Sequence, residues 1–413
     1  MIRITLRRVV SVITLSAVFT FYFIFILQSS LSSRKLEHSV TPNHNQIINK
    51  KSLLISQHQL EFYRINKNSY AVSAFTDERN GNMGYKYARV VLIIRTPEEF
   101  TCMFGDRIAT SVKLYELSEN HGKDKQVFIL NCQIPNDMDF TDIKHITIKR
   151  LIGEESTTIP ISYHIPDDKI EKSYPIKMST CIPSLFGNTY DAKRIIEYVE
   201  LSIMQGIEQL YIYLNTDDIR DIKLIKTLRH YTNNNIIQLI DMKLPFRDVD
   251  IWYHGQLIAV TDCLLRNSGV SKYTFFNDLD EFFVPLTDKS LGETLDKLFV
   301  DKKIGSQRTP LKYISTKEKE APVTLNNVIT SSRIERRFTK CVVRPEMVFE
   351  QGIHHTSRVI QDDYKTESND GELLQIYHYK EATHCCDNAL AIKNRYNKAL
   401  RKQFDHIVAL LNI

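Results

Sequence analysis

The segment KYTFFNDLDEFFVPL, residues 272–286, places three carboxylates directly after an apolar run. KYTFF has the length and aromatic content of a buried strand, so Asp278 and Asp280 are expected at its carboxyl end. Acidic side chains are seldom buried unless they are paired or bind a metal. The fold around this segment therefore has to explain why acids follow a core strand.

Strand-like and helix-like segments alternate on both sides of the acidic segment. The strand-like residues 176–186 precede a helix-like segment at 190–206, in which Asp191 matches an N-cap and Gly206 a C-terminal cap. Further strands are expected at 207–215 and 236–244, and further helices at 219–231 and 252–269. This alternation predicts a mainly parallel α/β sheet with flanking helices. Such sheets bind ligands outside the carboxyl ends of their strands.

The part of the chain before residue 174 differs in pattern. Between residues 69 and 164, short β-favouring segments are separated by Asn, Asp, Gly and Pro clusters, which predicts a small antiparallel β-rich unit. The polar residues 28–60 are typical of a stem. The predicted domains are a cytoplasmic tail (1–8), a transmembrane signal-anchor (9–27), a stem (28–68), a β-rich domain (69–165) and an α/β domain (174–413).

The predicted transmembrane helix rests on nineteen uncharged, mostly apolar residues, close to the ~20 that span a bilayer. Three arginines precede it and keep the short N-terminus cytoplasmic. A cleaved signal peptide is the alternative, but the run is longer than the usual signal core. The first 50 residues carry six basic and one acidic residue, which equals the whole net charge of +5. The remainder is neutral, so nucleic acid is not an expected partner.

Seven cysteines in a chain that faces a lumen or the exterior predict disulfides, with at least one thiol left over. The cysteines are Cys102, Cys132, Cys181, Cys263, Cys341, Cys385 and Cys386. A zinc site is the alternative, although the chain has no C-x-x-C pair. The connectivity stays open.

Two carboxylates at positions i and i+2, both reaching one site, suit a hard divalent cation that also takes phosphate oxygens as ligands. Bound Mn²⁺ or Mg²⁺ would stabilise a diphosphate leaving group as a Lewis acid. A solvated Asp-rich turn is one alternative interpretation. A phosphatase that uses Asp278 as its nucleophile is another. Such phosphatases normally have Thr or Val where this chain has Phe282.

The segment GQLIAVTDCLLRNSGVSKYTFFNDLDEFFVP, residues 255–285, resembles the signature of glycosyltransferase family 92. CIPSLFG at 181–187, RIIEYVELSIMQGIEQLYIYLN at 194–215, KCVVRPEMVFEQGIHH at 340–355 and YHYK at 377–380 are similar to further parts of that family. The resemblance covers about residues 177–395. It implies a GT-A-like catalytic domain in a type II membrane protein of the secretory pathway, with a single membrane pass in the Golgi and the catalytic domain in the lumen.

The resemblance also implies the reaction. Known members transfer galactose from a nucleotide sugar, here a UDP-sugar, to a glycan acceptor. Asp278 and Asp280 match the motif for the metal and the nucleotide sugar, and either His354 or His355 matches a late histidine that could complete the metal shell. Adjacent strand residues point to opposite faces, so only one of the two histidines can be the ligand. A member that binds glycans without turnover is the alternative.

An inverting transfer needs a carboxylate that takes a proton from the acceptor hydroxyl. The candidates are Glu346, Glu281, Asp362 and Asp363. Three other residues have both a functional and a structural interpretation. Asp262 could contact the nucleotide or form a surface salt bridge, Trp252 could stack on a sugar or lie in the core, and His378 could support the site or simply be partly buried. Tyr273 stands where the family pattern has Trp, and residues 302–335 match only loosely, so the substrate's identity stays open.

Overall fold

The computed structural model describes residues 59–79, 85–162, 174–186, 190–381 and 387–413. The predicted tail, the membrane segment, most of the stem, Cys385 and Cys386 lie outside these ranges. Within them, no helix is long and apolar enough to cross a membrane. The predicted domain boundaries stay a prediction.

A mixed twelve-stranded sheet forms the centre of the α/β region. Its parallel part runs in the order β1 (Gln59–Leu60), β13 (Ile237–Met242), β12 (Gln209–Leu214), β11 (Ile176–Leu185) and β14 (Ser271–Phe276). Beside β14 the direction reverses, because β18 (Glu335–Val343) pairs antiparallel with both β14 and β16 (Ile304–Ser315). The parallel α/β prediction is therefore confirmed for these five strands, whereas the sheet as a whole is mixed.

The remaining strands extend the sheet beyond β16. They are β15 (Glu281–Pro285), β17 (Ile329–Thr330), β21 (Lys365–Ser368), β22 (Leu374–Lys380) and β23 (Asp387–Asn388). β22 pairs antiparallel with β15 and parallel with β16, which brings the end of the chain's last long strand next to the acidic segment. A separate hairpin is formed by β19 (Val348–Gln351) and β20 (Thr356–Val359).

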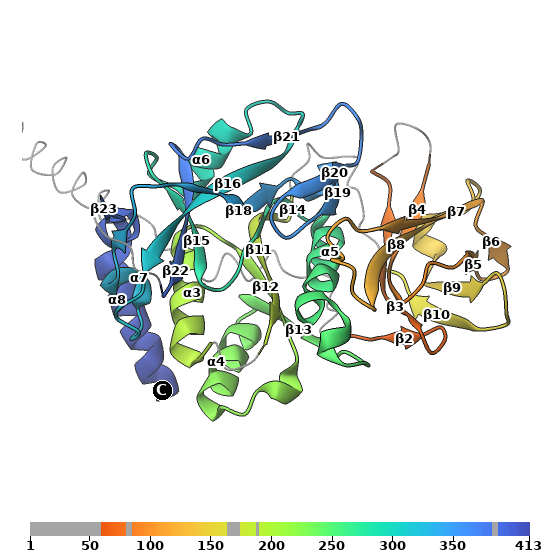
Figure 1. Cartoon of the computed structure of the whole chain (residues 1–413), viewed down its shortest axis with the longest axis horizontal. Coiled ribbons are helices and arrows are strands. Elements are labelled where there is room, and N and C mark those ends of the chain that lie inside the picture. The colour runs from red at the N-terminus through yellow and green to blue at the C-terminus, as the bar shows by residue number, and fades with distance from the viewer. Residues whose placement is uncertain (1–58, 80–84, 163–173, 187–189, 382–386) are drawn as a thin grey trace, which may run out of the picture. The chain divides into compact units, whose positions relative to one another are not determined.

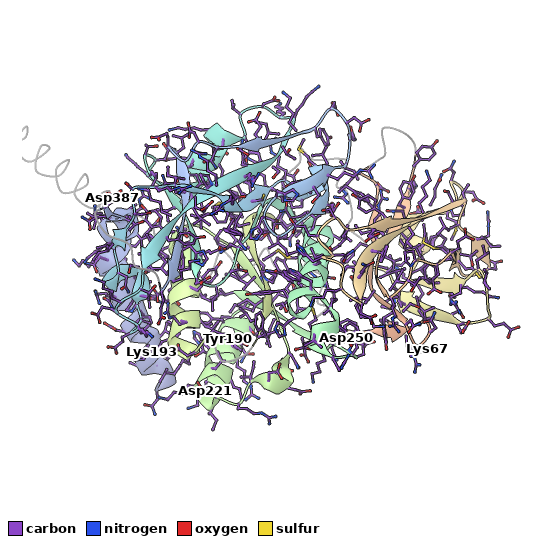
Figure 2. All side chains as sticks on the ribbon, viewed as in Figure 1. Lys67, Tyr190, Lys193, Asp221, Asp250 and Asp387 are labelled. Carbon is purple, nitrogen blue, oxygen red and sulfur yellow. A yellow bond between two sulfur atoms is a disulfide. The ribbon has the colours of Figure 1, made fainter. Side chains whose placement is uncertain are left out.

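The predicted helices form with the expected caps. Asp191 accepts the Arg194 N–H at the start of α3 (Ala192–Met204), and Gly206 has the positive φ that ends it. Asp221 caps α4 (Ile222–Asn233) in the same way and is labelled in Figure 2. The helix predicted from residue 252 begins later, as α5 (Gln256–Asn267), because the residues before it adopt left-handed conformations. The shorter helices are α6 (Leu291–Leu298) and α7 (Val323–Asn326), and the last helix is α8 (Ala391–Leu411).

The two faces of the parallel strands pack into different cores, as side-chain alternation requires. On β12, Leu210, Ile212 and Leu214 join the core that includes α3, α4 and α8. Tyr211 and Tyr213 point to the opposite face, against α5. Figure 1 shows α3 and α4 on one side of β11, β12 and β14 and α5 on the other.

The N-terminal residues form two antiparallel sheets, as the pattern predicts. One contains β2 (Tyr63–Arg64), β3 (Ser69–Asp77), β4 (Tyr87–Ile94), β8 (Gln126–Gln133) and β7 (Ser111–Glu116); the other contains β10 (Ser156–Pro160), β9 (His145–Arg150), β5 (Phe100–Phe104) and β6 (Arg107–Ile108). Side chains of the first sheet, including Phe75 and Ile129, share a hydrophobic core with Leu257 and Leu264 of α5. The β-rich residues thus pack directly on the helix that precedes the acidic strand.

Two disulfides confirm the prediction from cysteine content. Cys102–Cys132 joins β5 to β8 and so links the two N-terminal sheets. Cys181–Cys263 joins β11 to α5. Cys341 is a buried free thiol. The disulfide from α5 to β11 fixes the helix against the strand that neighbours β14.

Candidate active site

The acidic segment forms a tight turn at the carboxyl end of β14, where β15 begins. Buried Asn277 holds this turn: its amide donates to the Tyr198 hydroxyl and to the Glu281 carbonyl, each at 2.8 Å, and its carbonyl accepts the Thr180 hydroxyl at 2.9 Å. The backbone N–H of Asp278 donates to the Glu281 carboxylate at 2.9 Å. These bonds fix the direction of the acidic side chains at the sheet edge where parallel α/β folds bind ligands.

Asp278 and Asp280 are accessible, whereas Glu281 is not. Their side chains are 36% and 46% exposed, and that of Glu281 is 2% exposed. Glu281 therefore lies beneath the turn, and an acceptor hydroxyl could not reach it without rearrangement. The structure thus brings together Asp278, Asp280 and Glu281 and separates them into two surface acids and one buried acid.

A buried lysine balances part of this negative charge. The Lys340 ammonium, on β18, lies 2.7 Å from Oδ2 of Asp278 and 3.5 Å from Oε2 of Glu281. Burial acts to lower the pKa of Lys340, but the Glu281 and Asp278 carboxylates outweigh it and raise the pKa above its ordinary value. Burial is also the largest influence on Glu281 and raises its pKa to about 7. Lys340 thus stays charged and neutralises one of the three acids.

His378 occupies the other side of the turn. It stands directly opposite Glu281 in the β15–β22 pair, and its Nε2 lies 3.2 Å from Oδ2 of Asp280. Burial acts to lower the pKa of His378, but Asp280 and Glu281 raise it overall. Burial acts to raise the pKa of Asp280, but the hydrogen bond from His378 lowers it overall. His378 therefore orients Asp280 and supports its charged form.

The two surface acids each keep an oxygen that could bind a cation. Lys340 and His378 engage Oδ2 of Asp278 and Oδ2 of Asp280, and Gln256 donates a long hydrogen bond of 3.5 Å to Oδ1 of Asp278. Two carboxylate oxygens at one edge fit a hard cation that takes its other ligands from phosphate and water. Among the residues that the structure describes, no three His, Cys, Asp or Glu side chains gather closely enough to hold a metal by themselves.

The two adjacent histidines face different partners. The His354 ring lies 3.2 Å from the Thr339 carbonyl through Nδ1, so Nδ1 carries the proton, since a carbonyl only accepts. Burial, followed by the Lys340 charge, lowers the pKa of His354, and Asp278 acts weakly in the opposite direction. His355 instead lies 3.1 Å from the Glu119 carboxylate of the N-terminal β region. The charges of Lys340 and Asp278 thus act on His354, whose ring is bonded to Thr339, the residue before Lys340.

Glu346, Asp362 and Asp363 are not brought to the acidic turn. β18 runs antiparallel to β14, so Val343 pairs with Thr274 and the chain beyond it continues toward the amino end of β14. There Glu346, second to burial, raises the pKa of Tyr174. Asp362 and Asp363 are exposed near that same end, where Asp363 pairs with Lys303 at 3.3 Å.

Asp262 lies in the interior, in an ion pair with Arg266. The two side chains are 0% and 2% exposed, and the carboxylate accepts hydrogen bonds from the guanidinium at 2.9–3.2 Å. It also accepts the Tyr213 hydroxyl at 2.6 Å. Asp262 thus forms a salt bridge, as one interpretation had it, but in the interior and not at the surface, and its surroundings leave no face for a nucleotide.

Three consecutive residues with left-handed backbone conformation precede α5, and one of them is Tyr253. Tyr253, His254 and Gly255 have φ values of 43°, 55° and 79°, and two of them are not glycine, which indicates strain. Phe186 stacks on the His254 ring at 3.7 Å. Burial raises the pKa of Tyr253, and the Asp278 and Asp280 charges raise it further. Tyr253 is 52% exposed, so its ring is accessible, and it lies within electrostatic range of the two acids.

Trp252 is half-buried and contacts the His121 ring at 4.2 Å, so it belongs to the packing between α5 and the N-terminal sheets. Sequence reasoning missed Lys340 and Tyr253. Lys340 stands at the start of a family-like segment, but nothing local connects it to acids some sixty positions earlier. Lys340 could have been found only from the knowledge that residues 335–343 form a strand paired with the strand before the acidic turn.

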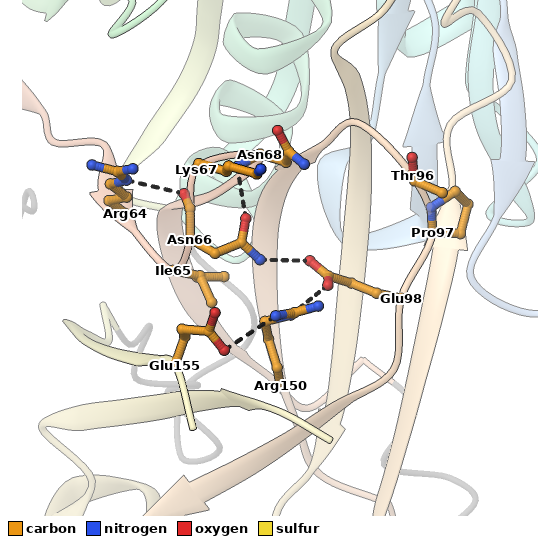
Figure 3. Close-up of a pocket in the computed structure, with 10 residues that line it drawn as sticks. All are labelled: Arg64, Ile65, Asn66, Lys67, Asn68, Thr96, Pro97, Glu98, Arg150 and Glu155. Atoms are coloured by element: carbon orange, nitrogen blue, oxygen red, sulfur yellow. Dashed lines mark hydrogen bonds and ion pairs between the residues drawn. The ribbon is translucent and has the colours of Figure 1, made fainter. Parts of the chain in front are cut away.

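Away from the acidic turn, a concavity of about 720 Å³ lies in the N-terminal β region. Its charged lining is largely paired internally: Glu98 binds Asn66 and Arg150, and Arg150 also binds Glu155, as Figure 3 shows. None of its lining residues belongs to the acidic turn or to the strands around it.

Comparison with known proteins agrees with the resemblance seen in the sequence. The model of glycosyltransferase family 92 matches residues 176–408. Beta-1,4-galactosyltransferase galt-1 of Caenorhabditis elegans is 49% identical over 424 aligned residues, covering 100% of both chains. Galactan beta-1,4-galactosyltransferase GALS3 of Arabidopsis thaliana is 27% identical over 216 residues, which are 48% of this chain and 40% of that protein. GALS1 of the same plant is 22% identical over 55% of this chain and 46% of its own length.

Proposed function

The chain belongs to glycosyltransferase family 92, and from this premise we propose that it transfers galactose from a UDP-sugar to a glycan with a divalent cation held by Asp278 and Asp280. It is a galactosyltransferase and hence a hexosyltransferase. The observation that carries the proposed chemistry is the pair of exposed carboxylates at the carboxyl end of β14. We also propose a GT-A-like classification for the catalytic region.

The charges at the turn support a metal. Asp278 and Asp280 are the exposed acids at the turn and Lys340 is buried beneath them, so an incoming diphosphate would meet two carboxylates first. A bound Mn²⁺ or Mg²⁺ would supply the positive charge that stabilises the leaving diphosphate. Lys340 and His378 hold the two carboxylates in place, so each presents its remaining oxygen outward. We propose His354, rather than His355, as the histidine that faces the donor, because its Nε2 is unprotonated and points away from the Thr339 carbonyl bond.

The aromatic ring of Tyr253 supports binding of the donor. An exposed ring next to a phosphate-binding edge offers a flat apolar surface to a sugar or base, and its hydroxyl can hydrogen-bond. The strained backbone at Tyr253 and His254 is held by Phe186 and by the Ser184 hydroxyl, which donates to the His254 carbonyl at 2.7 Å. We propose an inverting transfer, since the relatives are named for β-linked products. Family membership makes the phosphatase interpretation unnecessary.

The proposed setting is the Golgi membrane, with residues 9–27 as a single anchor and the catalytic region in the lumen. The disulfides in the described residues agree with an oxidising compartment. Membrane attachment of the full chain, and its loss on deletion of residues 1–28, would test this part of the proposal by carbonate extraction.

The activity is tested with the full-length protein in detergent, a panel of UDP-sugars and a glycan array. Asp278→Asn and Asp280→Asn are expected to lower galactose transfer about 100-fold or more, because each removes a carboxylate that would hold the cation on the leaving diphosphate. Glu372→Gln, an exposed acid elsewhere, is the matched control. Chelation should abolish the wild-type activity and added Mn²⁺ should restore it. Glycan binding without donor binding or transfer by the wild type would favour the glycan-binding alternative, and full activity in chelator would refute the metal.

A further inference from the structure

Two carboxylates cross between the N-terminal β region and the β19–β20 hairpin in opposite directions. Glu350 of β19 reaches to the β7–β8 turn, where it accepts the Tyr115 hydroxyl at 2.6 Å, the Ser118 N–H at 2.7 Å and the Ser118 hydroxyl at 2.8 Å. Glu350 is 2% exposed, so these bonds are shielded from water. The hairpin is thereby attached to the N-terminal sheet at its β19 strand.

Glu119, in the β7–β8 turn, reaches back to the tip of the hairpin. Its Oε2 accepts the Ile353 N–H at 2.6 Å, and its Oε1 lies 3.1 Å from Nδ1 of His355. Its side chain is 12% exposed. One carboxylate therefore spans residues 352–355, binding the backbone at one side of the turn and an imidazole at the other. Asn120, which bonds both to Leu117 and to Val127, fixes the β7–β8 turn from which Glu119 extends.

The hairpin tip has little freedom to adjust. A Cβ at Gly352 would lie 2.9 Å from the Glu119 carboxylate and 3.0 Å from the His355 carbonyl. On the opposite side, the Thr339 hydroxyl donates to the His354 carbonyl at 2.7 Å, and the His354 ring donates to the Thr339 carbonyl. The turn is thus held by Glu119 on one flank and Thr339 on the other.

We propose that Glu119 is a positioning residue for galactose transfer: it holds the turn at 352–355 so that His354 stays bonded to Thr339, next to Lys340 of β18, while His355 is retained by the N-terminal sheet. This proposal rests on the proposed function. Either of two adjacent histidines could be presented to the site by a loose turn. The Glu119 carboxylate decides between them by binding one, and groups that orient a metal-site histidine in this way typically change activity or metal affinity 10–100-fold. The N-terminal β region is then part of the catalytic unit.

A double-mutant cycle on the full-length protein tests this. His354→Ala is expected to lower kcat/KM about 100-fold and Glu119→Ala about 10-fold, each with a higher Mn²⁺ requirement that also appears as a raised Kd for Mn²⁺ in isothermal titration. Because Glu119 acts through His354, the variant that carries both changes should be no less active than His354→Ala. Glu119→Gln should recover most activity, since its amide oxygen still accepts the Ile353 N–H.

Glu116→Ala, on the exposed side of β7, is the matched control and should leave kcat/KM and the Mn²⁺ requirement unchanged. Gly352→Ala gives an independent test, because its methyl group displaces the Glu119 carboxylate and should reproduce the Glu119→Ala loss within about threefold.

If Glu119→Ala lowered kcat/KM by the same factor in the wild-type and His354→Ala backgrounds, the proposal would be overturned and Glu119 would be assigned to general stability. An unaltered Mn²⁺ requirement in His354→Ala, alongside inactive Asp278→Asn, would overturn it while leaving the proposed function standing. A wild type without transfer would instead refute the proposed function itself.

Discussion

Replacing Asp262 by Asn separates the two sequence interpretations of this residue. In the structure, Asn would keep one oxygen for the Tyr213 and Arg266 donors but turn an amide N–H₂ toward the guanidinium. The Arg266 charge, 2% exposed, would lose its counter-ion. Removing one partner of a buried pair costs about 3–5 kcal/mol. At an unfolding entropy of roughly 2.1 cal/mol/K per residue, a loss near 4 kcal/mol in a folded unit of this size lowers Tm by about 5 °C.

The assay is thermal unfolding followed by circular dichroism, together with donor KM on the folded enzyme. Tm should fall in Asp262→Asn, whereas the donor KM should not change, because the carboxylate makes no contact at the acidic turn. Asp250→Asn is the matched control: its partner Arg247 is 80% exposed, and such pairs contribute about 0–1 kcal/mol.

A second variant tests the cause of the loss. Asp262→Leu combined with Arg266→Leu removes both charges, and replacement of a buried pair by apolar side chains is often close to neutral. The double variant should therefore be more stable than Asp262→Leu alone. An unchanged Tm with a raised donor KM in Asp262→Asn would refute this reasoning and return Asp262 to nucleotide binding.

Three further predictions concern the candidate base, the aromatic ring and acid stability. Glu346→Gln should keep kcat within about threefold of wild type, because Glu346 lies toward the amino end of β14; a 100-fold loss in steady-state assays would make it the base. Tyr253→Ala should raise the donor KM about tenfold, consistent with 1–3 kcal/mol of lost ring contact, while Tyr253→Phe changes it less; a wild-type donor Kd in isothermal titration together with a wild-type KM would remove the ring from the donor site. Burial opposes ionisation of Asp77, but Arg79 and Arg89 lower its pKa. A carboxyl group whose pKa is lowered in the fold stabilises the fold at pH values above its ordinary pKa near 3.9. This stabilisation is lost as the pH falls toward the folded-state pKa, so the urea midpoints of wild type and Asp77→Asn should differ most at pH 7 and converge below pH ~4.

The local elements were predictable because their signals are local. The caps of α3, the strands β11 to β14 and the acidic turn after β14 all follow from side-chain periodicity and from residues within a few positions of each other. The start of α5 was predicted wrongly at residue 252, because periodicity continues through Tyr253 and His254 although their backbone is left-handed. The positive φ at these positions is imposed by tertiary contacts, here those of His254 with Phe186 and Ser184.

The candidate site was predictable only in part. The acids at positions 278 and 280 follow directly from the strand pattern, but their partners do not. Lys340 reaches Asp278 because β18 returns antiparallel beside β14, and His378 reaches Asp280 because β22 pairs with β15. Pairings between strands sixty to a hundred positions apart have no local signature, so the division into surface acids, a buried acid and a buried cation required the fold.

The amino-acid sequence by itself determined that acids follow a core strand of a parallel α/β region, since one strand and its turn lie within fifteen consecutive residues. The family resemblance also rested on sequence, and the match of the family model to residues 176–408 confirms it. Tertiary structure alone decided that Asp262 is an interior ion pair, that Glu346 lies away from the acidic turn, and that Glu119 binds His355 while His354 bonds to Thr339. The physical reason is that charge pairing and burial depend on which distant segments meet, and those meetings arise only when the sheet and the N-terminal β region pack together.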